Sequence, residues 1–181
     1  TGVEEKVRTK DISPDNYFSY RNHRIVYAAY DVDARWGWRD YSELRVLDIF
    51  DGVQRTISKK GKYFAPDISS DGRQVVAVQV LPDGKCTLHV LDGNSGTLVK
   101  AIPNPDELFY THPKFYGKQK IISAVRNKKG EMALGVFDIK DNTTVFTVTD
   151  TKLALIRDGE WKENLTKMRI MFEQAVNELF W

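Results

Sequence analysis

The chain has 181 residues, 41% of them hydrophobic and 12% aromatic, which is enough to bury a core in one or two domains. Its formal charge of +2 gives no strong field, so composition does not favour nucleic acid or a membrane surface as a partner. No apolar run reaches the roughly 18 to 20 residues that cross a bilayer, which predicts no membrane insertion. The single cysteine, Cys86, cannot form an intramolecular disulfide.

The N-terminal segment, residues 1–11, is charged where a secretory signal would be apolar. A start at Thr-Gly without Met suggests a processed or excised chain, so any signal of an exported parent would already be lost. Residues 5–9 are similar to 54–56, which predicts the outer strand of a preceding β-sheet unit.

A hairpin pattern recurs three times along the chain. Residues 44–48, 88–92 and 134–138 read LRVLD, LHVLD and LGVFD, at offsets of 44 and 46 residues. Each copy ends in an Asp-Gly, Ser-Gly or Asp-Asn turn, where a tight hairpin needs a positive φ. The acids Asp48, Asp71, Asp92 and Asp138 are predicted to be structural, because a carboxylate beside a turn can accept its backbone amides.

A second strand pair precedes each hairpin, and its copies begin at Phe18, Pro66 and Pro113. Each unit then contains four antiparallel strands rich in Val, Ile, Thr and aromatic residues. Four-stranded units of about 40 to 50 residues are typical of propeller blades, and the alternative is a stack of meanders in an open sheet. We place the blades at about 12–60, 61–105 and 106–150, within one domain over 1–150.

Residues 68–73, ISSDGR, followed by the Leu-x-Val-x-Asp strand and a Gly turn, resemble the WD-type (PD-variant) repeat of TolB-like β-propellers. The resemblance covers roughly residues 17–148 and implies an all-β partial β-propeller of about three four-stranded blades. It also implies a periplasmic or otherwise extracytoplasmic protein. The first and third copies lack the Asp of the motif, having Tyr20-Arg21-Asn22 and Tyr116-Gly117 in its place. Three blades cannot close a ring, so the chain is either part of a larger protein or associates to complete one.

The C-terminal region, 151–181, is predicted to be a linker and an amphipathic helix. From Trp161 to Leu179 the apolar residues recur at steps of three and four, which traces one helical face. This helix either folds back on the outer blade or begins a following domain. Residues 171–175, MFEQA, show a faint similarity to the helix that opens the catalytic half of tricorn-like peptidases.

No complete catalytic or metal site is found. The three histidines, His23, His89 and His112, lie in separate segments, and no Gly-x-Ser-x-Gly, His-Glu-x-x-His or Walker motif is present. We expect His89 to point away from the core. Asp31, Asp33 and Asp40 share a loop, but Arg35 and Arg39 oppose a cation there, so no metal and no cofactor are predicted.

The same loop is the candidate binding element. It gathers large side chains with polar groups, as interface hot spots do: Arg35, Trp36, Trp38, Arg39 and Tyr41. The alternative is that its tryptophans pack over a neighbouring blade. We therefore predict a non-catalytic binding or scaffolding module for a protein or peptide, or for other domains of the same parent chain. The alternative function is an accessory, substrate-filtering domain of a larger hydrolase, a peptidase.

Overall fold

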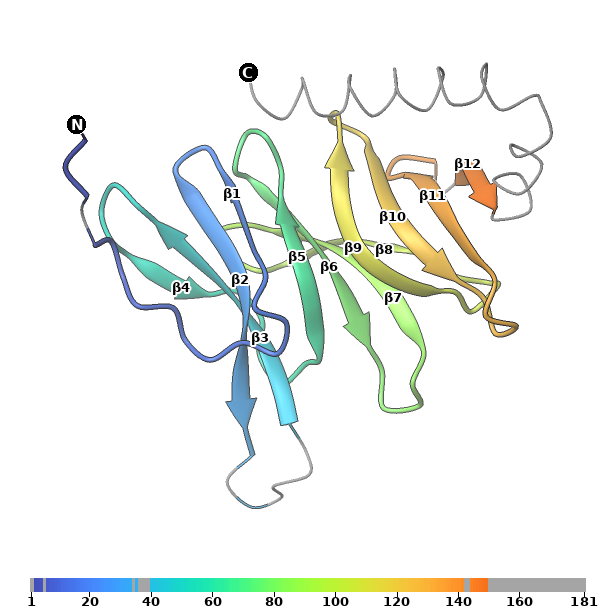
Figure 1. The fold of residues 1–181 in the computed structure, drawn as a ribbon, viewed down its shortest axis with the longest axis horizontal. Coiled ribbons are helices and arrows are strands. Elements are labelled where there is room, and N and C mark those ends of the chain that lie inside the picture. Colours follow the sequence, from blue (N-terminus) through green and yellow to red (C-terminus); the bar gives the residue numbers. More distant parts are fainter. Residues whose placement is uncertain (1, 5, 34, 36–39, 142–143, 150–181) are drawn as a thin grey trace.

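A computed structural model describes residues 2–4, 6–33, 35, 40–141 and 144–149 (Figure 1). Twelve strands in this part form three four-stranded antiparallel sheets, each in chain order. Blade 1 holds β1 (Phe18–Arg21), β2 (Arg24–Val32), β3 (Asp40–Asp48) and β4 (Gln54–Thr56). Blade 2 holds β5 (Tyr63–Ile68), β6 (Gln74–Val80), β7 (Cys86–Asp92) and β8 (Leu98–Ile102). Blade 3 holds β9 (Phe109–Tyr116), β10 (Lys120–Arg126), β11 (Met132–Asp138) and β12 (Thr144–Thr149).

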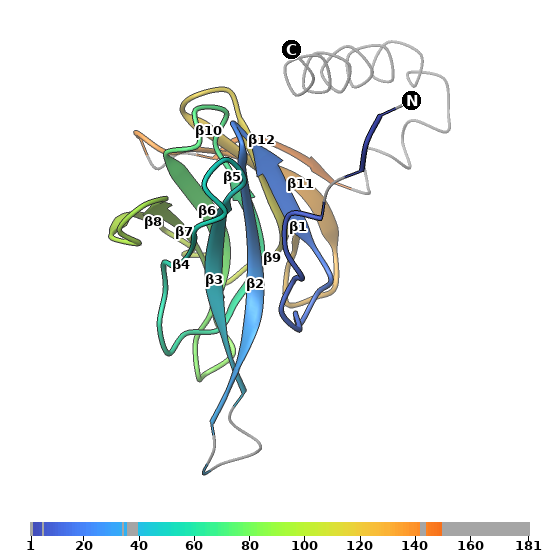
Figure 2. The ribbon, with the colours of Figure 1, turned by 90° about the vertical axis from the view of Figure 1, so that its left-hand side faces the viewer.

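The predicted all-β class with three four-stranded units is confirmed. The three sheets stand side by side in chain order (Figures 1 and 2). The predicted linker and helix at 151–181 lie outside the described residues. Among the described residues, no helix is long and apolar enough to cross a membrane.

The core lies between the sheets, so each blade has two buried faces. We call the face toward the preceding blade the entry face and the one toward the following blade the exit face. In β6, Val75 and Ala77 pack toward blade 1, whereas Val76 and Val78 pack toward blade 3, and all four are at most 3% exposed. Burial on both sides explains why this strand is a continuous apolar run rather than an alternating one.

The innermost strands, β5 and β9, each contain a β-bulge. Ala65 and His112 adopt positive φ values of 45° and 48°, and both precede a proline. The register of each strand shifts at this point. A bulge re-aims the side chains that follow it, here Asp67 and Lys114.

The N-terminal segment lies along the entry face of blade 1 without forming a strand. The described residues before Phe18 belong to no sheet of the structure, and the preceding unit to which the strand predicted at 5–9 would belong lies outside the described residues, so that strand stays a prediction. Asp11 instead accepts hydrogen bonds from Tyr27 at 2.5 Å and Gln54 at 3.3 Å, and pairs with Arg45 at 2.5 Å. A strand needs the edge of a partner sheet, and the described residues contain no sheet that precedes blade 1.

Candidate functional site

The β2–β3 hairpin extends further than its counterparts in the other blades. The β6–β7 ladder ends at the pair Val80 and Cys86, whose equivalent in blade 1 is Tyr30 and Ser42. Two further residue pairs continue the β2–β3 ladder, and the last joins Val32 to Asp40. The hairpin therefore projects beyond the ends of the neighbouring sheets, as Figures 1 and 2 show.

The predicted binding residues belong to the end of this hairpin. Tyr41 is half-buried in the ladder opposite Asp31, and Arg35 is exposed beyond the strand end. The backbone N–H of Arg35 donates to Asp33 Oδ1 at 2.9 Å, which turns the chain at the start of the tip. The other three predicted residues, Trp36, Trp38 and Arg39, lie outside the described residues.

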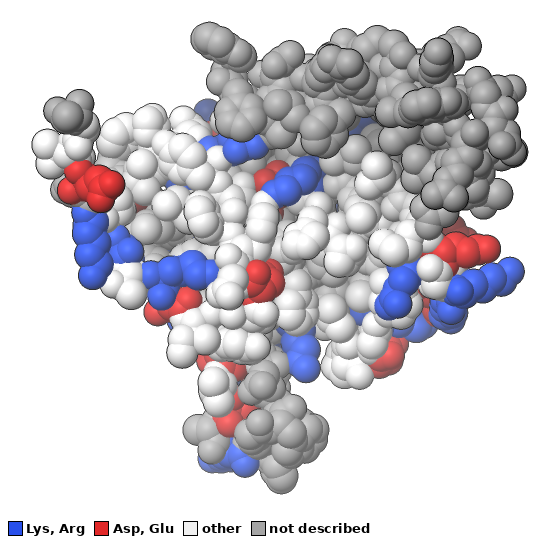
Figure 3. Space-filling view, viewed as in Figure 1, with Lys and Arg blue, Asp and Glu red and all other residues white. Residues whose placement is uncertain are grey.

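The hairpin stem exposes apolar surface together with charge. Tyr30 is 40% exposed and Val32 is 66% exposed, so neither side chain is fully packed against a neighbouring blade. Burial and the nearby Asp31 carboxylate raise the pKa of Glu43, which lies on the same stem. In the view of Figure 3, positive and negative groups lie next to one another at the projecting end.

The four repeated acids accept hydrogen bonds in their own turns. Asp48 accepts the amide of Phe50 at 3.1 Å, and the equivalent bonds run to Asp92 from Asn94 and to Asp138 from Lys140. Asp71 accepts the Ser69 hydroxyl at 2.6 Å and the Arg73 amide at 3.0 Å. These bonds lower the pKa values of Asp92 and Asp71. This geometry is what the predicted structural role requires.

Polar side chains at one repeated position join all three blades. Ser19, Asp67 and Lys114 pair in register with Val26, Val76 and Ile122 respectively, so they are equivalent residues of β1, β5 and β9. Asp67 Oδ1 accepts the Ser19 hydroxyl at 2.7 Å and Lys114 Nζ at 3.2 Å. The other oxygen, Oδ2, accepts the backbone N–H of Phe115 at 2.9 Å. We call these three side chains the inter-blade triad.

The inter-blade triad is strongly desolvated. Asp67 is 2% exposed, and burial raises its pKa although the Ser19 and Phe115 donors oppose the shift. Burial also lowers the pKa of Lys114 to about 8. The Lys114 ammonium lies 4.2 Å from the centroid of the Tyr17 ring, a cation–π contact. This triad was not predicted from the sequence, where its signal is a polar residue at one aligned position of each innermost strand.

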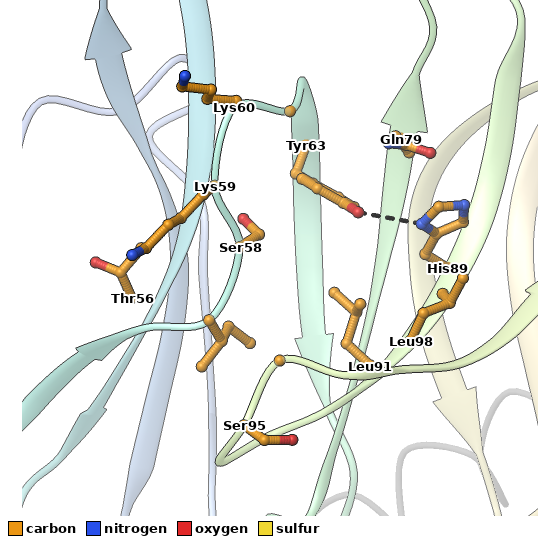
Figure 4. Close-up of a pocket in the computed structure, with 13 residues that line it drawn as sticks. Thr56, Ser58, Lys59, Lys60, Tyr63, Gln79, His89, Leu91, Ser95 and Leu98 are labelled. Carbon is orange, nitrogen blue, oxygen red and sulfur yellow. Dashed lines mark hydrogen bonds between the residues drawn. The ribbon is translucent and has the colours of Figure 1, made fainter.

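A cleft of about 360 Å³ opens between blades 1 and 2. Tyr63 and His89 form one wall, and Tyr63 Oη lies 3.1 Å from His89 Nδ1 (Figure 4). Ser58 and Leu91 also line the cleft, whereas the ammonium groups of the two lining lysines point away from the Tyr63–His89 pair in that view. Burial lowers the pKa of His89, which favours the neutral ring.

His89 thus lies on the entry face of blade 2 and not in open solvent, because blade 1 covers that side of β7. His23 stacks on Phe50 at 4.0 Å between ring centroids, and His112 lies 5.6 Å from the Tyr17 ring. Among the described residues, no three His, Cys, Asp or Glu side chains gather in a way that could hold a metal ion.

Solved structures similar to this chain are β-propellers. The propeller domain of the trilobed protease from Pyrococcus furiosus matches with a TM-score of 0.60 and 11% identity, over 74% of this chain and 42% of that one. A putative TolB from Agrobacterium tumefaciens matches with a TM-score of 0.59 and 15% identity, over 78% of this chain and 52% of that one. Acylaminoacyl peptidase from Pyrococcus horikoshii matches with a TM-score of 0.60 and 11% identity, over 74% of this chain and 25% of that one.

This chain therefore spans about a quarter to a half of the length of these proteins. No protein-family model matches the sequence, and no curated protein matches it. At such low identity the similarity establishes the fold. The described part of the chain is three consecutive blades of a β-propeller, of the kind found in TolB-like proteins and in the propeller domains of peptidases.

Proposed function

We propose that this chain is a non-catalytic binding module that holds a protein or peptide partner through the tip of the β2–β3 hairpin. The projection of that hairpin by two residue pairs beyond its counterpart in blade 2 carries the proposal. The added length presents a segment with two tryptophans and two arginines, Arg35, Trp36, Trp38 and Arg39. Tryptophan and arginine are the residues most enriched among interface hot spots.

The scaffold suits this role. A rigid sheet fixes the stem, and loops on a rigid scaffold are where binding residues concentrate. The exposed stem residues Tyr30 and Val32 continue the apolar surface toward the tip. A partner peptide would therefore meet aromatic anchors flanked by positive charge.

A peptide selection tests the proposal. Random dodecapeptides displayed on phage are selected against the chain, and the affinity of the winners is measured for Trp36→Ala and Trp38→Ala. We expect each substitution to weaken binding by about 2 kcal/mol or more, roughly 30-fold, with little change in melting temperature. Phe50→Ala is the matched control, because Phe50 is an aromatic residue 77% exposed in a β3–β4 turn. Equal binding by all three variants contradicts the proposal, as does a loss of about 3 to 5 kcal/mol of stability on Trp36→Ala.

A second candidate is an accessory domain that positions or filters substrate for a larger peptidase. The similarity to the propellers of two peptidases favours it, although this chain spans less than half of either protein. The parent reading frame beyond Trp181 distinguishes the two functions: a catalytic domain there supports the accessory role, and its absence supports a separate binding module.

We also propose that the chain alone has no hydrolase activity. A nucleophile needs a neighbouring base, yet His89 contacts Tyr63 and the Ser19 hydroxyl donates to Asp67. Fluorogenic peptide and ester substrates should remain intact with the purified chain. Turnover that disappears on His112→Ala would overturn this assignment.

The resemblance to TolB-like propellers leads us to propose an extracytoplasmic location. A signal sequence upstream of Thr1 in the parent gene would support this location, and recovery of the parent protein in the cytoplasmic fraction would contradict it.

A further inference from the structure

Three successive strands of blade 2 place polar side chains on one patch of its entry face. Tyr63 in β5 is paired in register with Gln79 in β6, and His89 in β7 lies diagonally across from Gln79. Side chains that are paired or diagonal in this way share one face of a sheet. They form a polar wall in the cleft between blades 1 and 2, whereas the rest of this face, at Val75 and Ala77, is apolar (Figure 4).

Close approach of the backbone gives this cleft its shape. A Cβ on Gly96 would overlap the Ile57 carbonyl oxygen, so the β7–β8 turn touches the chain that leaves blade 1. A Cβ on Gly61 would lie 2.7 Å from the Tyr63 ring, so the linker into blade 2 runs directly against that ring. The cleft of about 360 Å³ is at the small end of the roughly 300 to 1,000 Å³ of ligand pockets.

Several polar groups that line the cleft have unused hydrogen-bonding capacity. The Ser58 hydroxyl oxygen accepts the Leu44 amide at 2.7 Å, and no described residue accepts its hydrogen. The Gln79 amide and Nε2 of His89 make no hydrogen bond within the described part of the chain. Among the described residues, the one buried polar side-chain atom without a partner is Arg45 Nε. The unused groups of the cleft therefore border open space and are available to a ligand.

The polar groups that face the cleft are uncharged. Burial lowers the pKa of His89 and raises the pKa of Tyr63, so both are neutral near pH 7. None of the described residues that line the cleft carries a carboxylate. Of the two lining lysines, which point away from the polar wall in Figure 4, Lys59 interacts with the Glu43 carboxylate instead. A charged ligand group would lose its hydration without gaining a counter-charge here, so the site favours an uncharged polar group.

The Tyr63–His89 pair offers one donor and one acceptor in either tautomer of the imidazole. If the phenol donates to Nδ1, then Nε2–H is a donor and the phenol oxygen can accept; in the other tautomer the two roles are exchanged. The Gln79 side chain adds a second donor and a second acceptor. A carboxamide, with its N–H₂ next to its carbonyl, matches this arrangement, and Leu91 and Leu98 supply apolar surface beside it.

We propose that the cleft between blades 1 and 2 binds an uncharged small molecule that carries a carboxamide on a compact apolar body. The carboxamide bonds to Tyr63, His89 and Gln79, and the apolar body packs against Leu91 and Leu98. This inference goes beyond the hairpin function and does not rest on it, because no described residue of the hairpin tip lines the cleft.

Titration of the ¹⁵N-labelled chain with benzamide, followed by NMR, tests the site. We expect saturable binding with a Kd of about 1 mM or below, and the largest shifts at the Gln79 side-chain amide and the His89 backbone amide. Acetophenone has nearly the same shape but lacks the N–H donors, and benzoate replaces the amide by a charge. Each should bind at least about fivefold more weakly than benzamide.

Substitutions in the polar wall assign the binding to the cleft. Tyr63→Phe and His89→Phe keep a ring and remove its polar atoms, so each should weaken benzamide binding at least about fivefold. Gln79→Leu should do the same without touching the Tyr63–His89 contact, which keeps the test open if a ring variant loses its native circular dichroism. Tyr20→Phe is the matched control, because it removes the hydroxyl of a tyrosine that is 43% exposed and lies outside the cleft.

Three results would overturn the proposal: no saturable binding of benzamide, equal affinity for benzamide and acetophenone, or wild-type affinity in all folded variants of the polar wall. A further probe distinguishes a small molecule from a peptide side chain. N-acetylglutamine methylamide carries the same carboxamide on a peptide unit and should bind more weakly than benzamide. Tighter binding of this probe would identify a peptide as the occupant and overturn the assignment to a small molecule.

Discussion

Replacement of Asp67 by Ala should destabilise the fold more than the removal of an exposed carboxylate does. The substitution removes the acceptor of three donors, the Ser19 hydroxyl, the Lys114 ammonium and the Phe115 amide. Ser19 is 5% exposed and cannot turn to water, and each buried donor left without a partner costs about 1 to 3 kcal/mol. Lys114 can relax toward solvent because its side chain is 32% exposed. We therefore expect a loss of about 3 to 5 kcal/mol in the free energy of unfolding.

Equilibrium unfolding in urea, followed by circular dichroism, measures this loss. With a slope of about 2 kcal/mol per molar urea, the midpoint of Asp67→Ala should fall by about 2 M. Asp67→Asn should lie between wild type and Ala, since an amide keeps one acceptor oxygen and presents donors in place of the other.

Asp71→Ala is the control for Asp67. Asp71 follows the same strand and also accepts a hydroxyl and an amide, but its side chain is exposed, so its removal should cost only about 1 kcal/mol. If Asp67→Ala proves no more costly than Asp71→Ala, the inter-blade triad does not hold the three blades together.

Three further predictions follow from equally local geometry. Gly96→Ala should lower the free energy of unfolding by about 3 kcal/mol or more, because the new Cβ would overlap the Ile57 carbonyl oxygen across the blade interface. Gly52 also has a positive φ but lies in open space, so Gly52→Ala should cost only about 1 kcal/mol in the same urea assay. Asp92→Ala should cost about 1 to 2 kcal/mol without loss of peptide binding, and a loss of binding at unchanged stability would contradict its structural role. In carbon-13 NMR of labelled lysine, the Lys114 ammonium should titrate near pH 8, below its usual pKa of 10.5, because burial disfavours its charge. Its pKa should be lower still in Asp67→Asn, since the carboxylate stabilises the charged form. A wild-type midpoint above pH 10 would contradict this prediction.

The strand order was predictable because a four-stranded blade is built from local hairpins. Each turn carries Gly, Asn or Asp next to an acid, and these residues fix the register of the strands on either side without help from distant parts of the chain. The strand predicted at 5–9 is of the opposite kind: its pairing depends on a partner sheet, which the sequence of a single segment does not report.

The candidate site was only partly predictable. Alternation within β7 correctly separates His89 from the apolar side of the strand, but in a propeller the other side is covered as well, by the preceding blade. Contact between Asp67 and Lys114 depends on bulges at Ala65 and His112 and on the packing of adjacent sheets. The two residues lie 47 positions apart in the sequence, and this spacing does not reveal their contact.

The differences among the three copies indicate where each blade has been specialised. Arg45, His89 and Gly135 are equivalent residues on the three entry faces, and their chemistry is unrelated. Arg45 pairs with Asp11 and fixes the N-terminal segment, His89 contacts Tyr63 in the cleft between blades 1 and 2, and Gly135 leaves space that the Phe137 ring fills. The apolar residues of the interfaces repeat because every pair of sheets must pack, whereas this one position changes because each entry face meets a different neighbour. A scaffold that holds its packing constant can vary its clefts and its hairpin lengths independently, which is the property that a binding module needs.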